Sequence, residues 1–206
     1  MTQFQLKCDR LLAVELQNEK VLAIAGSAIA RDGQIKFEKA LLGGEGLLGV
    51  LKRKATKEQF ELMVARGSGT VYFASQAREI SILPLNGDKM FVESRSLLAF
   101  DEPLKTNVAF AGLRGATSGQ GLFTTTVEGR GNVAVISDGS LLTLEVTPSY
   151  PLFVDPDAFI GYQGNLRQEF VFDVNWKTLV GEESGETYQL KFTGNGIVYI
   201  QPSERK

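Results

Sequence analysis

The sequence contains no histidine among its 206 residues. Histidine is the side chain whose charge changes near neutral pH, so its absence excludes Ser-His-Asp and Cys-His nucleophile systems, histidine general bases and most metal-ligand sets. A serine–lysine pair is the one nucleophilic scheme that the composition permits, and no spacing in the chain indicates it. We therefore expect a non-enzymatic protein with no cofactor and no metal ion.

Cysteine and long apolar runs are also scarce. The single cysteine, Cys8, cannot form an internal disulfide, so nothing argues for an oxidising compartment. No apolar stretch approaches the ~20 residues that a membrane span needs. The first residues, Met1 to Gln5, lack the charged start and apolar run of a secretory signal. We expect a soluble, cytoplasmic protein.

Neither sign of charge dominates. The chain carries 22 basic and 24 acidic residues, for a net charge of −2. A general nucleic-acid binder has a strongly basic face, and this balance gives none, so we expect no nucleic-acid partner.

What the sequence does contain is a Gly-x-Gly-x-x string that occurs three times. The spacings between the first glycines are 62 and 65 residues, which indicates a long-period internal repeat. The six glycines are Gly67, Gly69, Gly129, Gly131, Gly194 and Gly196. Each string is followed by apolar residues typical of a β-strand.

The segments between these strings alternate apolar and polar residues, as β-strands do. In the first third, residues 12–16 and 21–25 flank Gln17-Asn18-Glu19 and are expected to form two strands in a hairpin-like arrangement. In the second third, residues 80–82 and 90–92 flank an expected turn at Asn86-Gly87-Asp88. Offsets of 69 and 62 residues align most apolar positions of the three thirds.

This pattern predicts an all-β fold made of three tandem β-sandwich repeats in a pseudo-threefold arrangement. The expected repeats are residues 1–76, 77–138 and 139–206, and they should form one compact body. Two interpretations of each Gly-x-Gly string are open. Glycine accepts positive φ, so the string could be a tight reversal between strands, which we favour, or a place where backbones approach closely without reversing the chain. A phosphate-binding loop would need a different context.

One cationic cluster is present, consisting of Lys52, Arg53, Lys54 and Lys57. It follows a glycine-rich segment at Gly43-Gly44 and several leucines, which predicts a short helical or glycine-rich connector. The cluster could contact anionic lipid or an acidic partner, but its four charges would contribute at most ~1 kcal/mol each near a charged membrane. We favour the simpler interpretation, a solvated face of the connector.

The chain resembles a known family along nearly its whole length. The residues that carry the resemblance are Gly43-Gly44 through Arg53, Phe60 through Gly69, Gly129-Arg130-Gly131 and Phe192 through Gln201. They resemble the altered-inheritance-of-mitochondria family, called mitochondrial biogenesis proteins in fungi. The resemblance implies three tandem units, each similar to the small β-sandwich of the tryptophan RNA-binding attenuation protein, a short relative of the double-stranded β-helix. No catalytic or ligand-binding residue carries over from it.

Two functions follow as expectations. The first is a structural or assembly protein that binds copies of itself or another protein through exposed sheet edges. The alternative is a small-ligand or RNA-binding module by fold analogy, a weak argument because one fold serves many functions.

Overall fold

The computed structural model describes residues 2–40, 61–110, 123–172 and 188–203. These residues form β-strands and one three-residue 3-10 turn, Ser94–Ser96. The strands are β1 (Gln3–Cys8), β2 (Leu11–Ile24), β3 (Ala28–Arg31), β4 (Gln34–Lys39), β5 (Leu62–Phe73), β6 (Glu79–Glu93), β7 (Leu97–Asp101), β8 (Lys105–Phe110), β9 (Phe123–Ser137), β10 (Leu142–Val146), β11 (Leu152–Val154), β12 (Phe159–Phe172) and β13 (Tyr188–Ile200). The all-β prediction is confirmed. None of the described segments is a helix that could cross a membrane.

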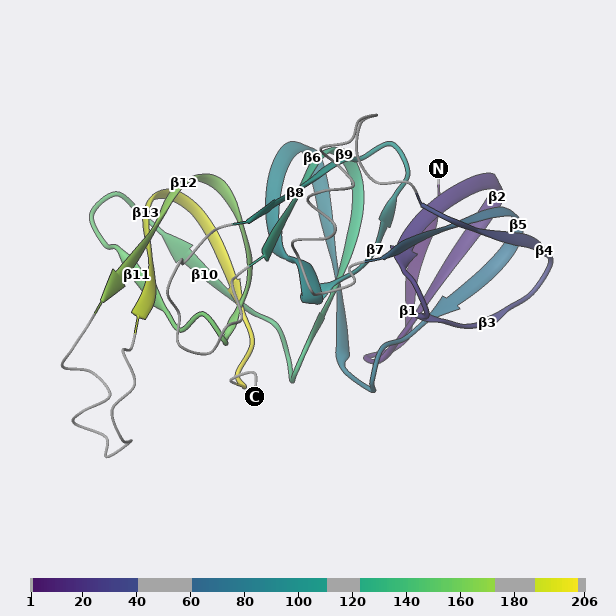
Figure 1. The fold of residues 1–206 in the computed structure, drawn as a ribbon, viewed down its shortest axis with the longest axis horizontal. Helices are drawn as coiled ribbons and strands as arrows, with labels where there is room; N and C mark the ends of the chain where they lie inside the picture. Colours follow the sequence, from purple (N-terminus) through teal and green to yellow (C-terminus); the bar gives the residue numbers. More distant parts are fainter. Residues whose placement is uncertain (1, 41–60, 111–122, 173–187, 204–206) are drawn as a thin grey trace.

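All thirteen strands join one antiparallel sheet, in the order β10-β13-β12-β6-β9-β7-β2-β5-β3. The other four strands pair at its sides: β1 with β2, β4 with β5, β8 with β9 and β11 with β13. Figure 1 shows the strands in three groups along the long axis: β1–β5 at one end, β6–β9 in the middle and β10–β13 at the other end. We call these the first, second and third strand groups.

The pairing register recurs from group to group. Each group has a short strand or strand segment that skips one residue and then pairs with a long strand. The corresponding cross-strand pairs are Ala30–Tyr72, Ala99–Ala134 and Gly161–Tyr199. Their spacing equals the offsets that align the thirds of the sequence. That the groups are three tandem sandwich repeats, with the boundaries and the pseudo-threefold arrangement given above, stays a prediction.

Two long strands replace expected turns. Gln17-Asn18-Glu19 does not reverse the chain, because β2 runs through it with a one-residue irregularity opposite β5. Asn18 takes up the extra residue with a φ of 60°, and its N–H donates to the Ser68 hydroxyl at 3.0 Å. Asn86-Gly87-Asp88 is likewise an irregularity inside β6. A β-bulge uses the same left-handed residues as a turn, and this explains the misreading.

Alternation along the strands builds three apolar clusters. Leu12, Val14 and Leu16 of β2 point into the first cluster, while Glu15 and Gln17 between them face solvent. The clusters do not respect the strand groups. Leu98 of β7, in the second group, is a buried member of the first cluster, and Ile160 of β12 is a buried member of the second. Neighbouring groups therefore share their cores.

Candidate functional site

The three Gly-x-Gly strings lie inside strands β5, β9 and β13, so the favoured interpretation as turns is wrong. The alternative interpretation, close approach of backbones, fits the geometry. Gly67 and Gly69 both have a φ of 141°, and a Cβ at either would lie closer than 3.0 Å to the backbone of the Gln34 or Asp32 segment. Glycine is required here because the break between β3 and β4 crosses directly over the string.

An aspartate caps the first two strings. Asp32 Oδ1 accepts a hydrogen bond from the N–H of Thr70, the residue after the first string, at 2.8 Å. Asp101 Oδ2 accepts from the N–H of Asn132, the residue after the second string, at 2.7 Å. A Cβ on Gly131 would meet the Asp101 side chain at 2.9 Å, so glycine makes room for the carboxylate.

The environment of Asp101 is unusual for a carboxylate. Its side chain is buried, and burial raises the pKa of this carboxyl while the hydrogen bonds from Asn132 act in the opposite direction. It lies beside a cavity of about 250 Å³ where the β2 bulge meets the β7–β8 turn and β9. The lining includes Thr2, Lys20, Asp101, Glu102 and Arg130. Lys20 and Glu102 form an ion pair at 3.1 Å across it. The cavity therefore presents charges of both signs.

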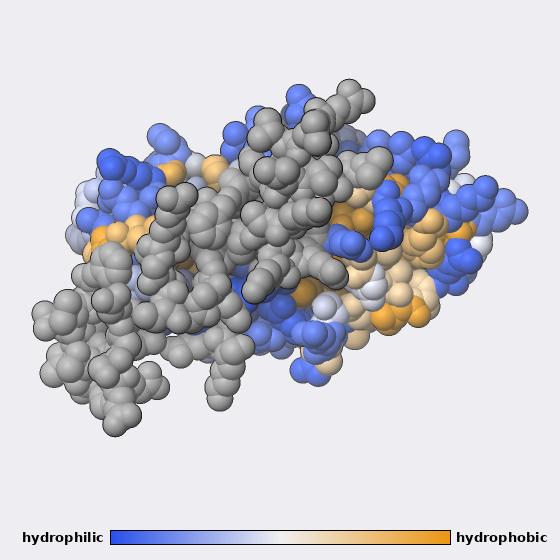
Figure 2. Space-filling model, viewed as in Figure 1, coloured by the Kyte–Doolittle hydropathy of each residue, from blue (hydrophilic) through white to orange (hydrophobic). Residues whose placement is uncertain are grey.

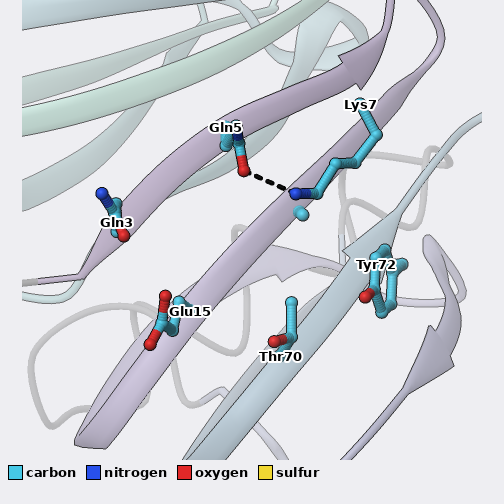
Figure 3. Close-up of a pocket in the computed structure, with 7 residues that line it drawn as sticks. Gln3, Gln5, Lys7, Glu15, Thr70 and Tyr72 are labelled. Carbon is cyan, nitrogen blue, oxygen red and sulfur yellow. Dashed lines mark hydrogen bonds between the residues drawn. The ribbon is translucent and has the colours of Figure 1, made fainter.

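A second, shallower recess lies on the outer face of β1, β2 and β5, and Figure 3 shows its lining. Two cross-strand rows build it, Gln3–Glu15–Thr70 and Gln5–Ala13–Tyr72. Because Ala13 is small, it forms the floor between the longer side chains. The Lys7 ammonium donates to Gln5 Oε1 at 2.6 Å along one side. The recess has a volume of about 70 Å³ and polar walls.

The ends of the molecule carry the exposed apolar side chains. Among the described residues, the large hydrophobic side chains that are exposed are Leu6, Ile29, Phe37, Leu142, Tyr150 and Phe153. The first three belong to the first strand group and the last three to the third. Figure 2 shows apolar surface over the first group, at the right-hand end of this view. Single exposed hydrophobic residues are common, but their restriction to the two ends is a pattern.

The basic patch of Lys52, Arg53, Lys54 and Lys57, with its connector, lies outside the described residues. Cys8 is exposed at the end of β1. Within the described ranges no three potential ligands group together to hold a metal ion. Sequence reasoning missed Asp101, Ile29 and Phe153. The offsets that align the thirds place Ile29 at the position of Leu98 and Ile160, so the signal for Ile29 was present.

Three comparisons with known proteins bear on the chain. Residues 4–203 match the family described as mitochondrial biogenesis AIM24. No curated protein matches. Protein SPYM3_0169 from Streptococcus pyogenes, known from a crystal structure, has a similar fold with a TM-score of 0.75 and 19% identity, over 99% of this chain and 94% of that one. At this identity the likeness concerns the fold alone. The family match covers nearly the whole chain, so the protein belongs to the mitochondrial biogenesis AIM24 family.

Proposed function

We propose that the chain is a non-enzymatic assembly protein that binds protein, including further copies of itself, through the two ends of its sheet. The carrying observation is the distribution of exposed apolar side chains. Among the described residues, all six large ones lie in the first and third strand groups, and the middle group contributes none. Side chains of this kind concentrated at particular places mark interaction surfaces.

The sheet edges support the same proposal. β3 and β11 each pair on one side only, with β5 and β13 respectively. An edge strand presents unpaired N–H and C=O groups that another strand can pair with. The lack of histidine, which removes the commonest general base, supports a non-enzymatic role.

Sedimentation velocity over a wide concentration range tests the proposal, using the full chain. We expect the sedimentation coefficient to rise with concentration as copies associate. A chain that stays monomeric at the highest concentration, and that purifies without a stoichiometric partner, would refute the assembly function.

One observation favours a second candidate, the binding of a small polar ligand in the 250 Å³ cavity. The hydroxyl of Thr2 lines this cavity, Thr2 is 8% exposed, and its Oγ1 has no hydrogen-bond partner. A buried hydroxyl without a partner costs about 1–3 kcal/mol, which a ligand could recover. Thermal-shift measurements with amino acids and nucleotides test this. A ligand at a hundredfold over its Kd should stabilise the chain by ~2.7 kcal/mol, and no shift with any of them removes this candidate.

A further inference from the structure

We propose that β3 of one copy pairs with β11 of a second copy, forming a third junction of the kind that already joins the strand groups within the chain. This inference rests on the proposed assembly function and names the surfaces and the register that it uses.

The two junctions inside the chain are the same contact made twice. At the first, β7 of the second group pairs with β2 of the first group, and Ala99 lies opposite Ala23. At the second, β12 of the third group pairs with β6 of the second, and Gly161 lies opposite Val92. Both sides of the contact shift by the offsets that align the sequence. A third junction by the same rule has Ala30 of β3 opposite Val154 of β11.

The strand that docks is covered in two groups and open in one. Leu98 of β7 and Ile160 of β12 are each fully buried in the apolar cluster of the preceding group. The corresponding residue of the first group is Ile29, the bulge residue of β3, and it is 61% exposed. No group precedes the first within the chain, so Ile29 has no core to enter.

The receiving strand shows the converse. Leu22 of β2 packs against the second cluster, and Phe91 of β6 packs against the third, where it stacks on Tyr162 with ring centroids 4.4 Å apart. The corresponding residue of the third group is Phe153 of β11, which is 49% exposed. Every buried member of the third cluster comes from the third group itself, whereas the first two clusters also take buried residues from the next group. Ile29 of a second copy would supply that contribution.

The predicted register also pairs complementary side chains. The Phe91–Tyr162 stack of the second junction corresponds to Phe153 facing Arg31. A guanidinium over an aromatic ring is a favourable pair. Both partners already make such contacts: the Arg31 guanidinium lies 5.4 Å from the Phe37 ring centroid, and the Lys191 ammonium lies 5.8 Å from that of Phe153. The polar recess of Figure 3 flanks this face beside Tyr72 and would form part of its rim.

The two surfaces differ and lie at opposite ends of the molecule (Figure 1). A contact between unlike surfaces is heterologous, so it leaves one free end of each kind on every dimer. Copies therefore add head to tail, in a ring if the rotation closes and in a filament if it does not. Both products carry the same β3–β11 contact.

Disulfide trapping tests the register in full-length chains whose Cys8 is replaced by serine. Ala30→Cys in one chain and Val154→Cys in another should form a mixed disulfide when the two are combined under mild oxidation, because opposed residues of antiparallel strands have Cβ atoms within disulfide reach. Peptide mass spectrometry identifies the link. The matched control combines Ala30→Cys with Thr143→Cys on the exposed face of β10 and should give no link.

An exposed charge tests the surface. Ile29→Asp should weaken self-association at least about ten-fold, because it removes the residue that enters the third cluster. Leu6→Asp, at another exposed apolar residue, should leave association unchanged. Thermal unfolding of both variants at low concentration shows that the fold is intact. If the natural chain associates, but the link between positions 30 and 154 is absent and Ile29→Asp has no effect, the β3–β11 junction is wrong and the assembly function stands. If the natural chain is monomeric throughout and purifies without a stoichiometric partner, both are wrong.

Discussion

Replacing Gly67 by alanine tests the role assigned to the Gly-x-Gly strings. Gly67 has a φ of 141°, and its missing Cβ would lie within van der Waals overlap of the Gln34 carbonyl oxygen. The backbone conformation alone costs an L-residue of order 1–3 kcal/mol. The overlap must also push β4 from β5, which weakens neighbouring ladder hydrogen bonds worth ~1 kcal/mol each. We expect Gly67→Ala to lower the free energy of unfolding by roughly 3–4 kcal/mol.

Gly87→Ala provides the matched control. Gly87 also has a positive φ, 102°, but a Cβ there would meet nothing within 4 Å. Only the conformational cost remains, about 1–2 kcal/mol. Urea unfolding followed by circular dichroism measures both variants, and equal m-values would show that the same surface is exposed on unfolding. If Gly67→Ala costs no more than Gly87→Ala, close backbone approach is not what requires glycine in the string.

Three further predictions concern single side chains. Gln201 is buried, accepts from the Asp138 N–H at 3.1 Å and donates to two backbone carbonyls, so Gln201→Ala should lower the free energy of unfolding by about 2–3 kcal/mol in the same urea assay. Burial raises the pKa of Asp101, so its contribution to stability is complete below the unfolded pKa of ~3.9 and is lost as pH rises through the folded value; relative to the natural chain, Asp101→Asn should lose less stability across that interval. Burial raises the pKa of Tyr162 to about 12, so Tyr162→Phe should keep the stack on Phe91 and remove a loss of stability that begins near pH ~10 and extends through the folded value, measured by alkaline unfolding.

The strand content was predictable because alternation reports burial on one face. The continuity of the long strands was not. Asn18 and Gly87 carry positive φ, which is the signature of a turn, yet each is an irregularity inside a strand that continues. A bulge and a turn draw on the same residue types, and what separates them is the partner strand, which lies far away in the sequence.

The third group shows the opposite outcome at the corresponding place. There Pro148 and Pro151 flank the expected turn, and the chain does break, into β10 and β11 joined through a bridge between Thr147 and Tyr150. Proline has no N–H to donate to a ladder, so a strand cannot continue through two of them. Proline was therefore a more reliable signal of a break than glycine or asparagine in this chain.

The candidate interaction surface was only partly predictable, for a reason that lies in the shared cores. An exposed Ile29 reads like any alternating strand residue until its counterparts Leu98 and Ile160 are known to be buried by the preceding group. Spacing could align these three positions. Only the structure shows that alignment implies a missing neighbour.

The composition of the first group's open strand can be explained by the same contact. Positions that hold Phe100 and Tyr162 in the second and third groups hold Arg31 in the first, and the residue before the bulge is alanine there. A strand as apolar as Leu97–Asp101 would be an aggregation hazard whenever no partner covered it. Arginine keeps this edge hydrated when it is free, and its guanidinium can still stack on Phe153. An end that must alternate between water and a partner is expected to differ from the internal strands in this way.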